Sequence, residues 1–141
     1  MHKSRLLRVP LLLCVAILAL AICVPARAQA QEAYLIRQNS SDCNNSNVNA
    51  NNPSLIGGAI SVVRQSNGST SAKVGITGTA DTTYNLYHKC VGQIGTITTG
   101  DEGVGGGEFT FQTNPGIVAF DMYPNGAPAG NVFQSVPITV R

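Results

Sequence analysis

Short runs in which apolar and polar residues alternate dominate the chain beyond its first third. The clearest run spans residues 71–77, where Ala72, Val74 and Ile76 alternate with polar positions such as Lys73. Because successive side chains of a strand point to opposite faces of a sheet, this pattern predicts a strand with one buried and one wet face. Similar runs predict further strands at 33–37, 59–65, 82–91, 93–99, around Phe109 and Phe111, at 117–123 and at 133–140.

Turn residues separate these runs and indicate the fold class. The Asn67-Gly68 pair predicts a tight hairpin, because both central residues of such a turn must tolerate a positive φ. The glycine-dense segment 100–107 predicts a second turn. With seven or eight short strands and no helical period, we expect an all-β domain, a two-sheet antiparallel sandwich of immunoglobulin-like type. A small β-barrel is the alternative.

One segment, residues 38–54, breaks the alternation. It contains seven Asn and four Ser and almost no apolar side chains. Such a segment cannot bury enough apolar surface to offset its ordering entropy, so it predicts a long surface loop. Cys43 lies near its middle and could tie the loop to the domain.

The first thirty residues have the pattern of a cleavable signal peptide. Three basic residues without an acid precede an apolar run at 11–24, and small residues follow at Ala28 and Ala30. The run is shorter than the ~20 residues that a membrane-spanning helix needs. We therefore expect cleavage after Ala28 or Ala30, a single domain over 31–141 with no membrane span, and secretion to the periplasm or the extracellular space.

Removal of this segment changes the charge of the protein. The whole chain has a formal net charge of +2, but residues 31–141 keep five basic and seven acidic side chains, a net charge of −2. No basic patch survives that could neutralise phosphates, so we expect no nucleic-acid partner.

Two cysteines remain in the expected domain, Cys43 and Cys90. In an oxidising compartment, two cysteines of a small domain most simply pair with each other, and we predict this disulfide. It would close a loop of about 48 residues and stabilise the fold by roughly 4 kcal/mol. Two free thiols or an intermolecular bridge are the alternatives.

The stretch from Asp81 to Phe111 contains three segments in order, TTYNLY, GTITTGDEG and FTF. This order resembles small bacterial immunoglobulin-like or fibronectin-type domains, in which a strand opening with Thr-x-Tyr precedes a short strand, an Asp/Gly turn and an aromatic strand. It is also similar to the enediyne-carrying apoproteins related to neocarzinostatin. The resemblance implies a β-sandwich, and the second family implies a small-molecule carrier. The chain departs from those apoproteins by offering one cysteine pair instead of two, and it contains no tryptophan.

Acidic side chains cluster around the glycine-rich turn, at Asp101, Glu102 and Glu108. Hard oxygen ligands close together can hold calcium. Residues 104–106, however, are Val and Gly, where an EF-type loop places oxygen ligands. We therefore interpret the segment as an acidic turn, and we expect no metal and no cofactor.

The pattern of the remaining polar and aromatic residues favours binding over catalysis. His88 is the one histidine of residues 31–141, and no nucleophile motif such as GxSxG accompanies it. Because a catalytic base needs a positioned nucleophile, we expect that the protein is not an enzyme. Tyr87 is out of phase with Tyr84, so it is expected to face outward and to contact a ligand. We thus expect a secreted, non-catalytic binding or surface-interaction module with an unknown extracellular partner. The alternatives are a small-molecule carrier, and a secreted enzyme or enzyme inhibitor acting through a loop.

Overall fold

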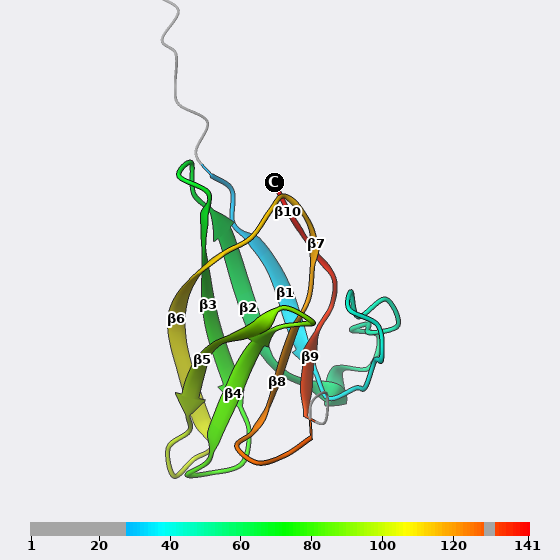
Figure 1. Cartoon of the computed structure of the whole chain (residues 1–141). Helices are drawn as coiled ribbons and strands as arrows, with labels where there is room; N and C mark the ends of the chain where they lie inside the picture. The colour runs from blue at the N-terminus through cyan, green and yellow to red at the C-terminus, as the bar shows by residue number, and fades with distance from the viewer. Residues whose placement is uncertain (1–27, 129–131) are drawn as a thin grey trace, which may run out of the picture.

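The computed structural model describes residues 28–128 and 132–141, and their regular structure is almost entirely β-strand (Figure 1). The all-β class is confirmed. A single turn of 3-10 helix, η1 (Pro53–Leu55), precedes the second strand. The ten strands are β1 (Gln31–Ile36), β2 (Ile56–Arg64), β3 (Ser69–Thr77), β4 (Thr83–His88), β5 (Gly92–Thr98), β6 (Val104–Gln112), β7 (Gly116–Val118), β8 (Phe120–Pro124), β9 (Phe133–Ser135) and β10 (Ile138–Val140).

Eight of these strands form one antiparallel sheet in the order β5-β4-β8-β9-β1-β2-β3-β6, and β7 pairs with β10 in a small second sheet. The large sheet curls until its two edge strands, β5 and β6, approach each other (Figure 1). Gly105 of β6 marks the approach, because a Cβ there would lie 2.9 Å from Cγ2 of Ile97 on β5. The sheet is therefore nearly closed, a shape compatible with either a sandwich or a barrel.

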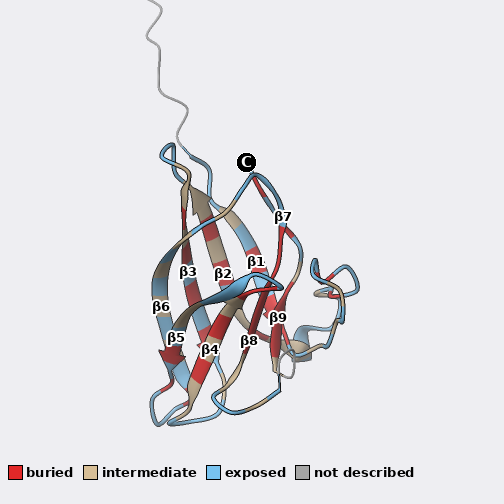
Figure 2. Ribbon diagram, in the orientation of Figure 1, coloured by how far each residue is buried: buried red, intermediate tan, exposed pale blue. Residues whose placement is uncertain are grey.

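Alternation along the strands places the core, as Figure 2 shows by colour. In β3, Ala72, Val74 and Ile76 are buried while Lys73 is exposed, so the predicted two-faced strand is confirmed. The interior is filled by large, fully buried side chains, and each such side chain contributes about 1.5–3 kcal/mol by leaving water. These side chains are Leu35, Ile36, Ile60, Val62, Tyr84, Leu86, Ile97, Phe120, Met122 and Phe133.

The predicted hairpin between β2 and β3 is present, with a different turn. Of its residues only Gly68 has a positive φ, +85°. The Gly68 amide donates to the Gln65 carbonyl over 3.0 Å, and the Gln65 amide donates to the Ser69 carbonyl over 2.7 Å. These bonds describe a three-residue loop whose left-handed glycine forms a bulge, so the expectation of two positive φ values at Asn67-Gly68 is wrong.

Two predicted strands are each divided in the structure. The run 117–123 breaks at Ala119 into β7 and β8, which belong to different sheets. The run 133–140 breaks at Val136 and Pro137 into β9 and β10. Proline has no amide hydrogen to give to a ladder, so it favours a change of sheet at this point.

The glycine-rich turn is shorter than the sequence suggested. It ends at Gly103, which has a φ of +76°, and the three glycines 105–107 belong to strand β6. The chain thus passes from β5 to β6 over a few residues, which brings the two edge strands together.

The expected signal peptide falls largely on residues 1–27, which lie outside the described residues. Ala28 and Ala30 are exposed and precede β1 directly. Within the described part of the chain, no helix is long and apolar enough to cross a membrane.

Candidate functional site

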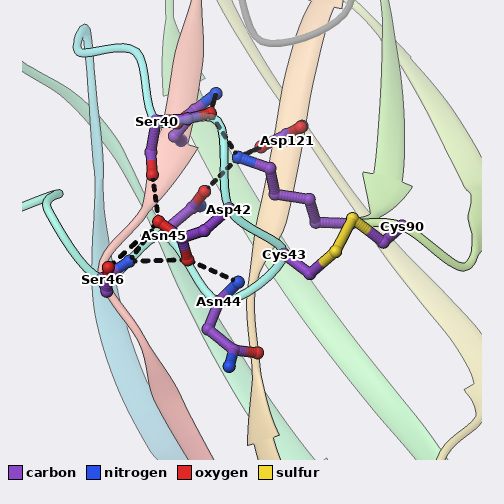
Figure 3. The surroundings of a disulfide bond; sticks show 10 residues. Ser40, Asp42, Cys43, Asn44, Asn45, Ser46, Cys90 and Asp121 are labelled. Atoms are coloured by element: carbon purple, nitrogen blue, oxygen red, sulfur yellow. Dashed lines mark hydrogen bonds and ion pairs between the residues drawn. A yellow bond between two sulfur atoms is a disulfide. The ribbon is translucent and has the colours of Figure 1, made fainter.

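The Asn-rich loop, residues 38–54, runs beside β9 and is held by a network of hydrogen bonds around Asp42 (Figures 1 and 3). The Asp42 carboxylate accepts bonds from the Ser40 hydroxyl at 2.7 Å, from the Asn44 amide at 2.9 Å and from the Ser46 amide at 3.1 Å. The Ser40 hydroxyl and the backbone amide of Ser46 hold the pKa of Asp42 well below its ordinary value. This carboxylate therefore orders a loop that has few apolar side chains.

A disulfide between Cys43 and Cys90 joins the same loop to the end of β4, with a Cα–Cα distance of 5.5 Å (Figure 3). The predicted pairing is confirmed. Cys90 and the loop residue Asn45 have φ values of 60° and 52°. The left-handed region is unfavourable for residues other than glycine, and such conformations gather where the surrounding structure enforces them.

A cluster of three buried polar side chains lies beside the disulfide, and we call Asn45, Lys89 and Asp121 the buried cluster. Their exposed fractions are 0%, 8% and 5%. The Lys89 ammonium donates to Oδ1 of Asn45 and, over 2.8 Å, to the backbone carbonyl of Ser40. It also lies 3.6 Å from Oδ1 of Asp121 (Figure 3). Each residue comes from a different segment: the loop, the end of β4, and β8.

The orientation of the Asn45 amide is fixed by the sheet. Its Nδ2 donates to the carbonyls of Phe120 at 3.3 Å and Ser135 at 3.0 Å, on strands β8 and β9. Oδ1 is therefore the atom directed at Lys89. Burial raises the pKa of Asp121, and the charge of Lys89 opposes that rise.

His88 lies on the inward face of β4, opposite the face that carries Tyr87. It is buried, and its ring centroid is 5.5 Å from that of Phe111 and 5.8 Å from that of Phe120. Among the described residues its Nδ1 has no hydrogen-bond partner, and burial lowers the pKa of the imidazole. The histidine is thus a neutral packing residue enclosed by aromatic rings.

Tyr87 points outward from β4 and is half-buried. Its ring stacks on Tyr123 of β8, with the ring centroids 4.8 Å apart and the planes 9° from parallel. Desolvation and a hydrogen bond with Tyr87 raise the pKa of Tyr123 to about 12, so its hydroxyl keeps its proton over the ordinary pH range.

Three amide side chains continue the face that carries the two tyrosines. Asn85 Nδ2 donates to Asn125 Oδ1 over 3.3 Å, and Gln93 Nε2 donates to Asn85 Oδ1 over 3.2 Å. In the sheet register Gln93 lies opposite Tyr87, and Asn85 lies opposite Tyr123. We call this set, Asn85, Tyr87, Gln93, Tyr123 and Asn125, the tyrosine–amide surface.

The three acidic residues considered for calcium lie in different settings. Asp101 and Glu102 are exposed in the turn, whereas Glu108 lies within β6 opposite Lys73 of β3. Over residues 28–128 and 132–141, no group of three or more His, Cys, Asp or Glu side chains is placed to hold a metal ion.

Sequence reasoning singled out Tyr87 and the two cysteines but missed the buried cluster. A signal was present, because Asn45 lies two positions from Cys43 and Lys89 directly precedes Cys90. Pairing the cysteines brings these two residues together. Comparisons of the chain with protein-family models, with curated proteins and with solved structures found no match.

Proposed function

We propose that the protein is a secreted, non-catalytic binding module, and that the tyrosine–amide surface binds neutral carbohydrate. The stacked pair of Tyr87 and Tyr123 is the observation that carries this proposal. Tyrosine offers an apolar ring and a polar hydroxyl, which suits a ligand with apolar C–H faces and many hydroxyls. The pair lies on strands rather than on a flexible loop, so little ordering is needed when a ligand binds.

The amides around the pair support the same class of ligand. An amide side chain both donates and accepts hydrogen bonds, as a sugar hydroxyl does. The tyrosine–amide surface contains no charged side chain, and the nearby Asp121 is buried beside Lys89. A neutral polyhydroxylated ligand therefore matches this surface better than an ionic one.

The test is binding of the purified protein to immobilised cellulose, chitin, xylan and mannan, measured as isotherms. We expect binding to at least one of these polysaccharides, and a loss of at least tenfold in affinity for Tyr87→Ala and for Tyr123→Ala. Tyr34→Ala is the matched control, because Tyr34 is a 52% exposed tyrosine on β1, outside the tyrosine–amide surface. Binding to none of the four, or equal loss in all three variants, would overturn the proposal.

A further inference from the structure

The buried cluster places an amine, a carboxamide and a carboxyl group in mutual contact, in a site almost free of solvent. Lys89 is 8% exposed, Asn45 is 0% exposed and Asp121 is 5% exposed. Burying an ammonium and a carboxylate is costly unless they are paired and fully hydrogen-bonded. Here the pairing is incomplete, since Asp121 Oδ1 has no hydrogen-bond partner in the described structure and lies 3.6 Å from the amine.

We propose that Nζ of Lys89 and the side chain of Asn45 become joined by an isopeptide bond, with Asp121 carrying the protons. This inference concerns the buried cluster and does not depend on the tyrosine–amide surface binding a ligand. It assigns to the chain a self-catalysed modification that adds a second covalent link between the Asn-rich loop and the end of β4.

The geometry satisfies what such a reaction needs. Lys89 Nζ contacts Asn45 Oδ1, and because a C=O bond is only about 1.2 Å long, the amine also lies close to Cγ, the carbon to be attacked. The carbonyls of Phe120 and Ser135 hold Nδ2, the leaving nitrogen, on the side away from the amine. Groups held in contact in this way react as if at very high local concentration.

The steps balance without any external reagent. Asp121 takes a proton from Lys89 Nζ, leaving a neutral amine whose electron pair forms a bond to Cγ of Asn45, while the C=O π pair moves to Oδ1. The protonated Asp121 supplies a proton to Oδ1. Asp121 then carries the excess proton from the new C–N nitrogen to Nδ2. The C–Nδ2 bond breaks, ammonia leaves, the carbonyl re-forms, and the proton on oxygen returns to the carboxylate.

The environment of Asp121 fits this role. Burial raises the pKa of its carboxyl group, which favours the protonated form that a proton donor needs. The low solvent exposure of Lys89 and Asn45 matters as well, because a water molecule at Cγ would compete with Lys89. Backbone conformations at the site are also unusual, since Asn45 and Cys90 both have positive φ.

The disulfide explains how the two reactants meet. Cys43 lies two residues before Asn45, and Cys90 directly follows Lys89. Closing the 43–90 disulfide therefore brings the reacting side chains together before any isopeptide bond exists. Unlike the disulfide, the isopeptide bond would persist in reducing conditions.

Peptide mapping of the purified full-length product, after reduction and alkylation of the cysteines, tests the proposal. Trypsin cuts after Lys and Arg, so an unmodified chain yields separate peptides 38–64 and 74–89. With the isopeptide bond, cleavage after Lys89 is blocked. Residues 38–64 and 74–141 are then recovered as one species. Its mass is lower by one ammonia than the summed masses of the separate peptides 38–64 and 74–141. Recovery of 38–64, alkylated at Cys43, and of 74–89 as two separate peptides would overturn the proposal.

Mapping is chosen over intact mass alone because cyclisation of an N-terminal glutamine also releases ammonia. Cleavage after Ala28 or Ala30 would expose Gln29 or Gln31 at the N-terminus. The joined peptide contains neither residue, and although its own N-terminal Gln38 can also cyclise after digestion, that reaction does not join two peptides. Complete cleavage after the exposed Lys73 in the same digest shows that the missed cleavage is specific to Lys89.

Asp121→Asn is the matched variant, because it keeps the size of the side chain and removes its acid–base function. We expect this variant to form the disulfide and give a native circular-dichroism spectrum, but to yield the separate peptides. Asn45→Ala removes the reacting carbon and should also yield the separate peptides. Full cross-linking in Asp121→Asn would overturn the role given to Asp121.

Discussion

Two covalent links that close nearly the same loop should not contribute independently to stability. The disulfide joins residues 47 positions apart. The chain-entropy relation gives about 4 kcal/mol for closing such a loop in the unfolded state. If Asn45 and Lys89 are already linked, the disulfide closes only a ring of the five residues 43–45 and 89–90, for which the same relation gives about 2 kcal/mol.

The perturbation is to reduce the 43–90 disulfide of the already folded protein with dithiothreitol, in the natural chain and in the Asp121→Asn variant. An unfolding entropy of about 2.1 cal/mol/K per residue gives about 0.23 kcal/mol/K for a domain of about 110 residues. The midpoint of thermal unfolding should therefore fall by about 9 °C in the natural chain and by about 17 °C in Asp121→Asn.

Circular-dichroism melts of the oxidised and the reduced form of each protein measure the two decreases at one pH and one scan rate. The destabilisation caused by Asp121→Asn itself cancels, because each decrease is taken within its own background. The difference corresponds to a coupling of about 2 kcal/mol, well above the few tenths expected for independent sites. Equal decreases in the two backgrounds would refute the reasoning, since the disulfide would then be the only link closing this loop.

Two further predictions concern the closure of the sheet and the order of the loop. A Cβ at Gly95 would collide with a phenylalanine ring of β6, whereas a Cβ at Gly75 would meet open space. Gly95→Ala should thus lower the free energy of unfolding, measured in urea, by about 1–3 kcal/mol. Gly75→Ala is the control and should leave this free energy nearly unchanged. Equal effects of the two substitutions would contradict the close approach of β5 and β6. The pKa of Asp42 is lowered in the folded protein. Its stabilisation of the loop is therefore complete only above pH 3.8, the ordinary pKa of the group, and is lost as the pH falls through the lower pKa of the folded state. The protection factors of the amides of residues 41–48, which compare their exchange with that of an unfolded chain at the same pH, should therefore fall in acid. Asp42→Asn should show low protection factors at neutral pH, and high protection factors in that variant would contradict the role of this carboxylate.

The strands that the sequence predicted well are those whose pattern is local. In β3, apolar side chains alternate with polar ones, and in β4 Tyr84, Leu86 and His88 lie inward together. A period of two is set by the pleat of a strand and does not depend on its neighbours. The outward direction of Tyr87 follows from the same rule. Its stacking on Tyr123 depends on the pairing of β4 with β8, which no local pattern contains.

The breaks within predicted strands depend on partners that are distant in sequence. Ala119 lies inside an apolar run, yet its carbonyl accepts the amide of Lys89 over 2.9 Å. The strand ends there, and β7 before it pairs with β10 in the other sheet. A continuous apolar run is equally consistent with one strand or two, because burial alone does not say which sheet receives each half.

The polar composition of residues 38–54 predicts a surface loop, and for the same reason it gives no indication that the loop contributes to a buried cluster. Alternation along β8 directs Asp121 outward, and an outward carboxylate predicts exposure to water. The Asn-rich loop covers this position instead, so Asp121 is buried. Within the loop, Val48 is the one aliphatic side chain that is less than a tenth exposed. A loop with so little apolar surface is held by polar and covalent contacts. Asn45 makes the polar contacts at the point where the loop meets the sheet, so the group that anchors the loop is also the group in contact with the buried amine of Lys89.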